Sequence, residues 1–456
     1  MTLLWFRGRV SASSFLFCVT FVLVSVFVFT AAFPARAAEP LPPLDLSEVE
    51  LLVQEALRAS PDIRSAEAVA AAAGERVRPA GALPDPMVLV NYENDGVGFS
   101  LGEEPMTRLT FMAQQAIPFP GKLRLAKEVA RKDAERARTV PQRAVLSIAA
   151  SVRRSYADLV EAREGLRLVD EQIQTWQSIE EVSRVRYSTG LASQQDVLRA
   201  QSERTRLLQQ RLRDGAAERT ALAELRRLLF RPVDAPVPTG LRLTPGHRVT
   251  VPSGAEVLAR ALERTPELKE AALTKERFDL SADLARRNLR PDFVASAAYM
   301  NRGSLPLMWS AGVAVSIPLW AGEKQRPLIV EAESQSSAAA AAGESIRRRI
   351  AALTEERLIR LDQLAEEARL DADGILVQDQ LSVESALASY RTGSVPFVTV
   401  LEALGTYFGD RRAALSRLAN VIRAQADLEE FSLEGSVRAS MVSQSAAAAS
   451  PASPKM

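Results

Sequence analysis

The sequence contains almost none of the side chains from which enzymes and metal proteins build reactive sites. Its only cysteine, Cys18, lies in an N-terminal apolar run, and its only histidine, His247, lies in a stretch with loop composition. The chain beyond that run therefore has no disulfide, cysteine-zinc site or cysteine nucleophile. It also lacks a phosphate-binding loop of the GxxxxGK[ST] type. A carboxylate-pair hydrolase is the one catalytic option left, so we expect neither catalysis nor a cofactor.

Aromatic residues and net charge are also scarce. Aromatic residues make up 6% of the chain and the formal net charge is +1, although 25% of residues are charged. A near-neutral chain with interspersed charges does not favour a nucleic-acid partner. Alanine, leucine, arginine and glutamate dominate, which is typical of long helices and coiled coils.

The first 37 residues have the pattern of a secretory signal peptide. Arg7 and Arg9 precede an apolar run over 15–33, and Ala35-Arg36-Ala37 matches a small-residue cleavage site. We expect cleavage after Ala37. Because the apolar run is long, an uncleaved membrane anchor is the alternative.

The rest of the chain is duplicated. Tyr187-Ser188-Thr189-Gly190 returns as Tyr390-Arg391-Thr392-Gly393, 203 residues later. Each copy predicts the same order: helix, strand, strand, very long helix, sharp turn, helix. We place the first repeat at 38–234, a linker at 235–252, the second repeat at 253–435 and a disordered tail at 436–456.

Two very long helical patterns dominate the repeats, over 123–186 and 323–388. At 1.5 Å per residue, each would span roughly 95 Å. Pro141 and Gly165 in the first, and Pro327, Gly343 and Gly374 in the second, are the expected interruptions.

Half-length helices accompany the long ones. The expected ranges are 47–78, 194–230, 255–290 and 398–434. Two half-length helices stacked end to end would match one long helix, in a coiled-coil-like array. Gly190 and Gly393 are expected to end the helices before each turn in the left-handed conformation.

Four segments favour strands, at 87–92, 108–117, 292–300 and 308–317. Nine or ten residues of mixed polarity suit one crossing of a transmembrane barrel, and two soluble hairpins are the alternative. Four strands cannot close a barrel, since the smallest have about eight, and an open edge is not tolerated in lipid. The predicted fold class is therefore mainly α with a transmembrane β part: a trimeric 12-strand β-barrel continued by a long α-helical coiled-coil tunnel.

Four motifs in this order resemble the TolC-like outer-membrane efflux proteins over nearly the whole chain after the signal. They are Ala82-Leu83-Pro84-Asp85-Pro86, Ile117-Pro118-Phe119-Pro120-Gly121-Lys122, Tyr187-Ser188-Thr189-Gly190 with Asp196-Val197-Leu198-Arg199-Ala200-Gln201, and Tyr390-Arg391-Thr392-Gly393. The Pro-Phe-Pro-Gly-Lys stretch is most similar to the cobalt-zinc-cadmium or copper resistance branch. Some relatives there carry a lipidated cysteine that this sequence lacks.

The resemblance implies a passive exit duct in outer-membrane lipid, with its helical part in the periplasm. It implies a homotrimer that docks onto a periplasmic membrane-fusion adaptor, which links it to an inner-membrane pump of the RND type. Heavy-metal cations are the expected cargo. Drugs or type I secreted polypeptides are alternatives, because no Met-, His- or Cys-rich stretch indicates metal contact. A periplasmic coiled-coil adaptor or structural protein is the rival class, but it would not explain the duplication.

The resemblance also implies two acidic positions near the pore. Glu402 matches a position that rings the pore in the family, whereas the family's other acidic position falls on Thr399. Asp196 is the corresponding candidate after the first turn. Carboxylates around a narrow axis attract cations and repel anions. The alternative is that both acids stabilise helix N-termini through the helix dipole.

The residues of the two turns match the family's adaptor contacts. They are Tyr187, Gly190, Leu191, Ala192 and Ser193 at the first turn, and Tyr390, Gly393 and Ser394 at the second. The second turn departs from the first after its glycine, so we expect the two turns to differ in docking. For the two tyrosines, packing is the alternative to hydrogen bonding. Phe119 and Trp320 follow strands, where an interfacial aromatic belt is expected.

Overall fold

The computed structural model describes residues 46–101, 104–237, 240–247 and 249–430, all within one compact unit. The expected signal peptide and C-terminal tail lie outside these residues. Among the helices described, none combines the length and the apolar character needed to cross a membrane.

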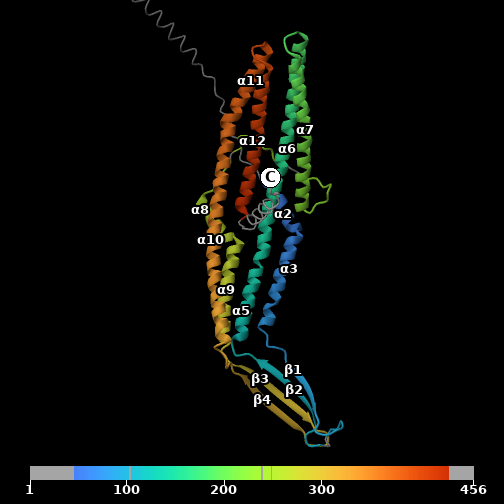
Figure 1. Ribbon diagram of the computed structural model, residues 1–456, viewed down its shortest axis with the longest axis vertical. Helices are drawn as coiled ribbons and strands as arrows, with labels where there is room; N and C mark the ends of the chain where they lie inside the picture. Colours follow the sequence, from blue (N-terminus) through green and yellow to red (C-terminus); the bar gives the residue numbers. More distant parts are fainter. Residues whose placement is uncertain (1–45, 102–103, 238–239, 248, 431–456) are drawn as a thin grey trace, which may run out of the picture. The chain divides into compact units, whose positions relative to one another are not determined.

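The two halves of the chain repeat one order of elements (Figure 1). The first half contains α2 (Ser47–Ala59), α3 (Pro61–Glu75), α4 (Val77–Ala80), β1 (Met87–Glu93), β2 (Arg108–Ile117), α5 (Lys122–Ala137), α6 (Thr139–Ser188) and α7 (Gln194–Leu228). The second contains α8 (Gly254–Arg264), α9 (Pro266–Arg287), β3 (Asp292–Asn301), β4 (Met308–Ser316), α10 (Gln325–Leu370), the π-helical turn η1 (Asp371–Ile375), α11 (Leu376–Thr392) and α12 (Phe397–Glu429).

Most of the expected helix interruptions are corrected by the structure. The first long helix breaks at Arg138 rather than at Pro141, which becomes the third residue of α6. The ring of Pro141 prevents a helical hydrogen bond to the carbonyl group of Ala137, four residues earlier, so α5 ends at Ala137. Gly165 and Gly343 do not interrupt their helices; only Gly374 coincides with a distortion, inside η1.

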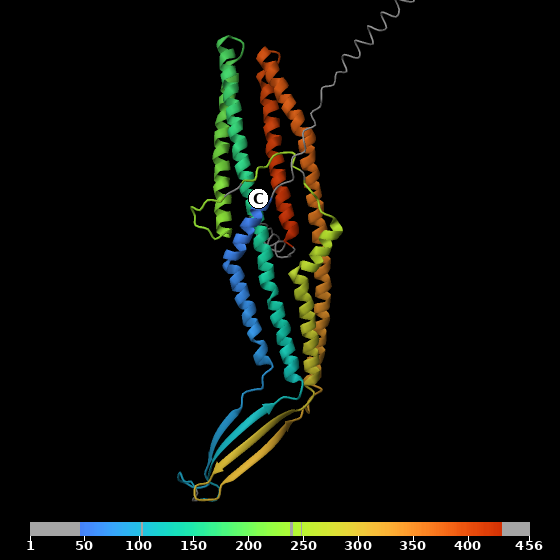
Figure 2. The ribbon, with the colours of Figure 1, turned by 180° about the vertical axis from the view of Figure 1, so that it is seen from behind.

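The half-length helices stack along the long ones, as predicted. Helix α7 packs on α6, and α2 and α3 pack on the same helix (Figures 1 and 2). In the second half, α8, α9 and α12 pack on α10, and α11 packs on α12. The largest buried cluster joins α2, α6, α7, α11 and α12, with Tyr156 and Leu404 at most 1% exposed.

Charged side chains tie α12 to the first repeat. Arg411 and Arg423 of α12 pair with acids of α6, namely Glu171 at 2.5 Å, and Asp158 at 2.6 Å together with Glu161 at 2.5 Å. Arg412 pairs with Asp214 of α7 at 2.5 Å. These pairs are partly buried, and they fix the register between the second helical hairpin and the first.

The four strands form one antiparallel sheet in the order β1-β2-β3-β4. Cross-strand partners share a face, and so do residues two apart along a strand. By this register, every charged strand residue lies on one face, here called the charged face: Glu93, Arg108 and Asp292. Every aromatic strand residue lies on the other, here called the aromatic face: Tyr92, Phe111, Phe293, Tyr299 and Trp309.

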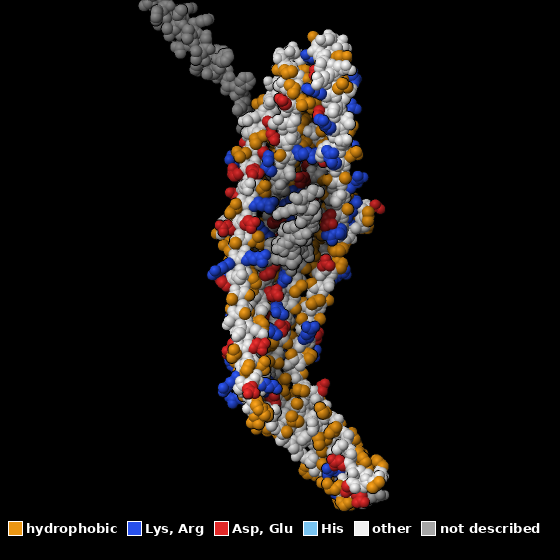
Figure 3. Space-filling model, in the orientation of Figure 1, with side chains coloured by type: hydrophobic (Ala, Val, Ile, Leu, Met, Phe, Trp, Pro, Cys, Tyr) orange, Lys and Arg blue, Asp and Glu red, His pale blue; other side chains and the backbone are white. Residues whose placement is uncertain are grey.

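The exposure of the sheet is unusual for a soluble protein. Val313 and Trp309 on the aromatic face are 72% and 79% exposed, and all residues of β4 are exposed. Hydrophobic side chains are prominent over the sheet in Figure 3, whereas charged ones are spread along the helices. A large exposed apolar surface marks an interaction with lipid or protein.

The Pro-Phe-Pro-Gly-Lys motif closes the junction between β2 and α5. Gly121 has φ +94°, a conformation that L residues rarely adopt. Lys122 donates to the carbonyl oxygen of Arg290 at 2.9 Å and pairs with Asp292 at 2.8 Å. The Asp292 carboxylate also accepts from the Phe119 amide at 2.7 Å. The motif therefore ties the first repeat to the start of β3.

Candidate functional site

The two sharp turns have the same backbone geometry. Gly190 and Gly393 have φ values of +73° and +82°, which confirms the expected left-handed helix ends. After each glycine, a backbone amide bonds back to the last helical turn: Leu191 to Arg186 at 2.7 Å and Ser394 to Ser389 at 2.9 Å. This is the Schellman pattern, in which glycine satisfies otherwise unpaired carbonyl groups.

The first turn is open to solvent. Tyr187 is 47% exposed and Leu191 is 67% exposed, while Ser193 caps α7 by accepting the Asp196 amide at 3.3 Å. Ala192 is half-buried and Gly190 is exposed. The turn thus presents two large side chains, Tyr187 and Leu191, beside small and polar ones.

The second turn is anchored. Tyr390 is 3% exposed, and its ring lies 5.6 Å from that of Phe397. Its hydroxyl group lies 3.4 Å from that of Ser183 on α6. Gly393 and Ser394 remain exposed. Tyr187 and Tyr390 occupy equivalent repeat positions, yet one faces solvent and the other is buried, so the turns differ structurally.

Arg186 bridges the two hairpins, a role that the sequence analysis missed. Its guanidinium group donates to the carbonyl oxygens of Tyr390 at 2.6 Å and Arg391 at 3.1 Å, and lies 4.7 Å from the Tyr390 ring centre. It also donates to the carbonyl oxygen of Leu191 at 3.1 Å. One side chain of α6 therefore holds the end of α11 and its own turn. We call this set of contacts the Arg186 bridge.

The two candidate pore acids differ in position. Asp196 lies in the first turn of α7, where the helix dipole favours a carboxylate. Glu402 is exposed and lies in the second turn of α12, where the helix dipole no longer stabilises a carboxylate. Among the described residues no hydrogen bond or ion pair engages the Glu402 carboxylate. The geometry does not bring Asp196 and Glu402 into one paired site.

A buried acid stabilises the first hairpin below its turn. Glu180 of α6 is 5% exposed and accepts from Gln201 at 3.1 Å and Arg204 at 2.8 Å, both on α7. Burial alone would raise the pKa of Glu180, but these hydrogen bonds and the nearby arginines lower it overall. Ionised Glu180 therefore joins α6 to α7 through hydrogen bonds.

The second hairpin contains an uncompensated acid pair instead. Asp379 of α11 faces Asp410 of α12, and one oxygen of Asp379 is buried without a donor. Burial, and then the neighbouring Asp410 carboxyl group, raise the pKa of Asp379. The adjacent contact, Asp371 of η1 with Arg417 of α12 at 2.5 Å, is a normal ion pair.

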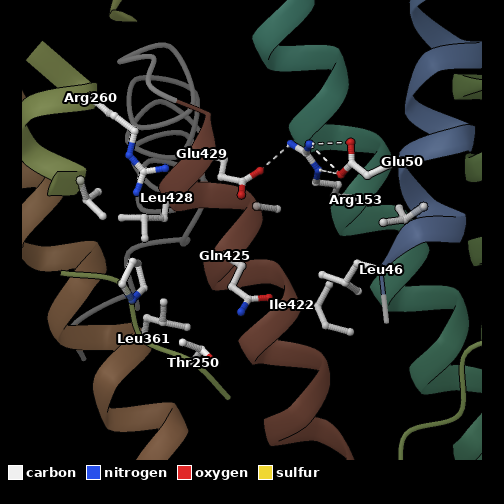
Figure 4. A pocket seen from close by; sticks show the side chains of 14 residues that line it. Leu46, Glu50, Arg153, Thr250, Arg260, Leu361, Ile422, Gln425, Leu428 and Glu429 are labelled. Carbon is white, nitrogen blue, oxygen red and sulfur yellow. Dashed lines mark hydrogen bonds and ion pairs between the residues drawn. The ribbon is translucent and has the colours of Figure 1, made fainter. Parts of the chain in front are cut away.

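A cavity of about 280 Å³ lies farther from the turns, among α2, α6, α8, α10 and α12 (Figure 4). Arg153 is its most prominent charge, but it already pairs with Glu50 at 2.8 Å and Glu429 at 3.1 Å. Leucine and isoleucine side chains form much of the remaining wall. Because Arg153 is already paired, we assign the cavity to packing between the repeats rather than to chemistry.

A duplicated chain with long helical hairpins and a two-faced sheet defines the class of outer-membrane channel protomers. The family model of the outer membrane efflux proteins matches residues 52–229 and 257–432. These matches cover more than half of the chain, so the chain belongs to the outer membrane efflux protein family. No curated protein sequence matches the chain.

Solved structures share the fold. The outer-membrane channel OprN has a TM-score of 0.71 and 17% identity, covering 88% of this chain and 95% of that one. A membrane protein from Pseudomonas aeruginosa has a TM-score of 0.72 and 16% identity, covering 85% and 93%. CusC has a TM-score of 0.70 and 17% identity, covering 88% and 99%. At such identities the likeness establishes the fold alone.

Family membership confirms the predicted class. The chain is a protomer of an outer-membrane efflux duct of a tripartite system, located in the outer membrane with its helices in the periplasm. The expected partners agree with this family. They are two further copies of the chain, a periplasmic adaptor and an inner-membrane pump of the RND type. The rival interpretation as a periplasmic adaptor loses its support.

Proposed function

We propose that the duct exports heavy-metal cations passively, without catalysis. Three copies pair the free edge β4 of one with the free edge β1 of the next to close a twelve-stranded barrel. Their helices form the tunnel that continues this barrel into the periplasm. The separation of charged and aromatic residues onto opposite faces of the sheet supports the proposed barrel. A transmembrane barrel needs such a sheet, with the aromatic face toward lipid and the charged face toward the lumen.

The cargo is proposed from one motif. The Pro118-Phe119-Pro120-Gly121-Lys122 stretch resembles the metal-resistance branch of the family. Drugs and secreted polypeptides are the alternative cargoes, and no contact in the structure favours either.

The turns are proposed as the adaptor-docking end, with Glu402 and Asp196 near the constriction. Leu191 supplies an exposed apolar contact, and Gly190, Ala192 and Ser193 leave space around it. Of the candidate contact residues at the second turn, Gly393 and Ser394 are exposed, while the buried Tyr390 is held by the Arg186 bridge.

Metal tolerance and membrane conductance test the function together. In planar lipid bilayers, the purified protein should form stable cation-preferring channels. Cells lacking it should become more sensitive to cobalt, zinc, cadmium or copper salts, with unchanged sensitivity to dyes and detergents. Folded protein that never conducts would contradict the duct, and a drug-sensitive but metal-tolerant strain would contradict the cargo.

A further inference from the structure

Within the described residues, the methionines are confined to the sheet region. The sequence has eight, and the five in the described residues are Met87, Met106, Met112, Met300 and Met308. Four lie in strands and Met106 lies two residues before β2. None lies in α2 to α12, although these helices contain most of the described residues. Packing in the helical core therefore does not account for their positions.

All four strand methionines lie on the charged face. Met87 pairs with Gln114, so it lies diagonal to Met112 across β1 and β2. Met112 is in turn diagonal to Met300 across β2 and β3, and Met300 is the direct partner of Met308. Diagonal neighbours are about 7–8 Å apart and direct ones about 5 Å, within reach of long side chains. One methionine from each strand thus forms a continuous row, here called the thioether row.

The sulfur atoms of this row lie in a polar setting. Met112 accepts a hydrogen bond from the Gln114 side chain at 3.0 Å, and Met308 accepts one from Arg302 at 3.3 Å. Met87 and Met308 are 64% and 41% exposed. A methionine that merely filled an apolar gap would not direct its sulfur at polar donors. The aromatic face, which is the one suited to lipid, has no methionine in its strands.

We propose that the thioether row binds soft monovalent cations, Cu(I) or Ag(I), along the barrel lumen. This inference rests on the proposed function, because it places the charged face inside a closed barrel. Thioether sulfur selects soft cations, whereas Zn(II) and Co(II) need imidazole, thiolate or carboxylate ligands. Within the described residues no group of three or more such ligands exists.

The spacing of the methionines in the thioether row suits the passage of cations along the lumen better than their tight binding at one site. Met300 and Met308 supply two sulfur atoms side by side, and Met112 and Met87 supply further ones toward the helices. Conduction requires sites strong enough to admit an ion and weak enough to release it to the next site. Sites of one or two thioethers meet both needs, so the row defines a path that leads toward the outer loop that contains Met106.

Silver nitrate in chloride-free buffer tests the inference on the full-length trimer. The wild type should bind Ag(I), measured by competition with a chromogenic chelator, and should not bind Zn(II). The quadruple variant M87L/M112L/M300L/M308L should lose Ag(I) binding. A control with V88L and V313L, on the aromatic face of the same strands, should retain it. Absent Ag(I) binding in the wild type, or equal binding in the quadruple variant, would overturn the proposal.

Potassium conductance in the same preparations separates the two proposals. A wild-type channel that conducts K⁺ but binds no Ag(I) refutes the thioether row and leaves the duct intact. If the quadruple variant forms no channel, the double variant M300L/M308L, which changes only the directly paired methionines, replaces it. That variant should bind Ag(I) more weakly than the V88L/V313L control, and equal binding would again overturn the proposal.

Discussion

The acidic residues after the two turns occupy different positions in their helices. Asp196 sits in the first turn of α7, whereas Glu402 lies one turn further into α12 and is exposed. The sequence indicated both as pore acids or as helix caps. The helical positions separate these explanations, because only Asp196 can act through the helix dipole.

Glu402→Gln should lower the preference of the channel for cations, because three carboxylates near a narrow axis would become neutral. The measurement is the K⁺/Cl⁻ permeability ratio from reversal potentials in planar bilayers. Asp234→Asn, which neutralises an exposed acid in the loop after α7, is the control and should leave the ratio unchanged. An unchanged ratio for Glu402→Gln would remove Glu402 from the constriction.

The Asp379–Asp410 pair should make the α11–α12 contact depend on pH. The folded-state pKa of Asp379 is raised, so ionisation above that pKa weakens the contact, and protonation strengthens it as the pH falls toward the unfolded pKa. The charged neighbours Arg411, Arg412 and Arg417 are held by other acids. Hydrogen exchange of the α11 amides should therefore slow more than base catalysis alone explains as the pH falls through the raised pKa of Asp379.

Asp410→Asn is the matched variant for this pair. It removes the repulsion while preserving size and hydrogen bonding, so α11 should be better protected near neutral pH and the excess pH dependence should disappear. Equal pH dependence in the wild type and the variant would contradict this account of the pair.

At the scale of elements, the sequence predicted which segments form helices and strands, but not every boundary or contact. The helix ends at Gly190 and Gly393 were predicted correctly, because the left-handed conformation of glycine is a local backbone property. The break at Arg138 follows from the exclusion of the Ala137 carbonyl group by Pro141, and the π-helical turn at 371–375 begins at Asp371, which pairs with the distant Arg417. The Arg186 bridge joins residues some 200 positions apart, so no local pattern could reveal it.

Arg186→Met should loosen the second hairpin from the first. The variant keeps an apolar stem against Tyr390 but loses the hydrogen bonds to the carbonyl oxygens of Tyr390 and Arg391. Single-channel recordings should then show higher conductance or a higher open probability. Arg184→Met is the control, because Arg184 pairs only with Glu180 and Glu181 of its own helix in the described structure. Equal conductance in both variants would show that the bridge does not hold the hairpins closed.

At the scale of the whole molecule, the duplication and the four strands followed from the sequence, but the identity of the two sheet faces did not. The methionines are dispersed over more than 200 positions and form no rich stretch, so the sequence indicated no metal contact. The antiparallel register alone brings Met87, Met112, Met300 and Met308 into one row.

Assembly is the central claim, because one protomer supplies four strands with two free edges. Electron cryo-microscopy of the detergent-extracted full chain tests it most directly. The account predicts a three-fold particle in which β4 of each copy pairs with β1 of the next, closing a twelve-stranded barrel with the thioether row inside. A monomeric particle, or a closed barrel with the aromatic face inward, would contradict it.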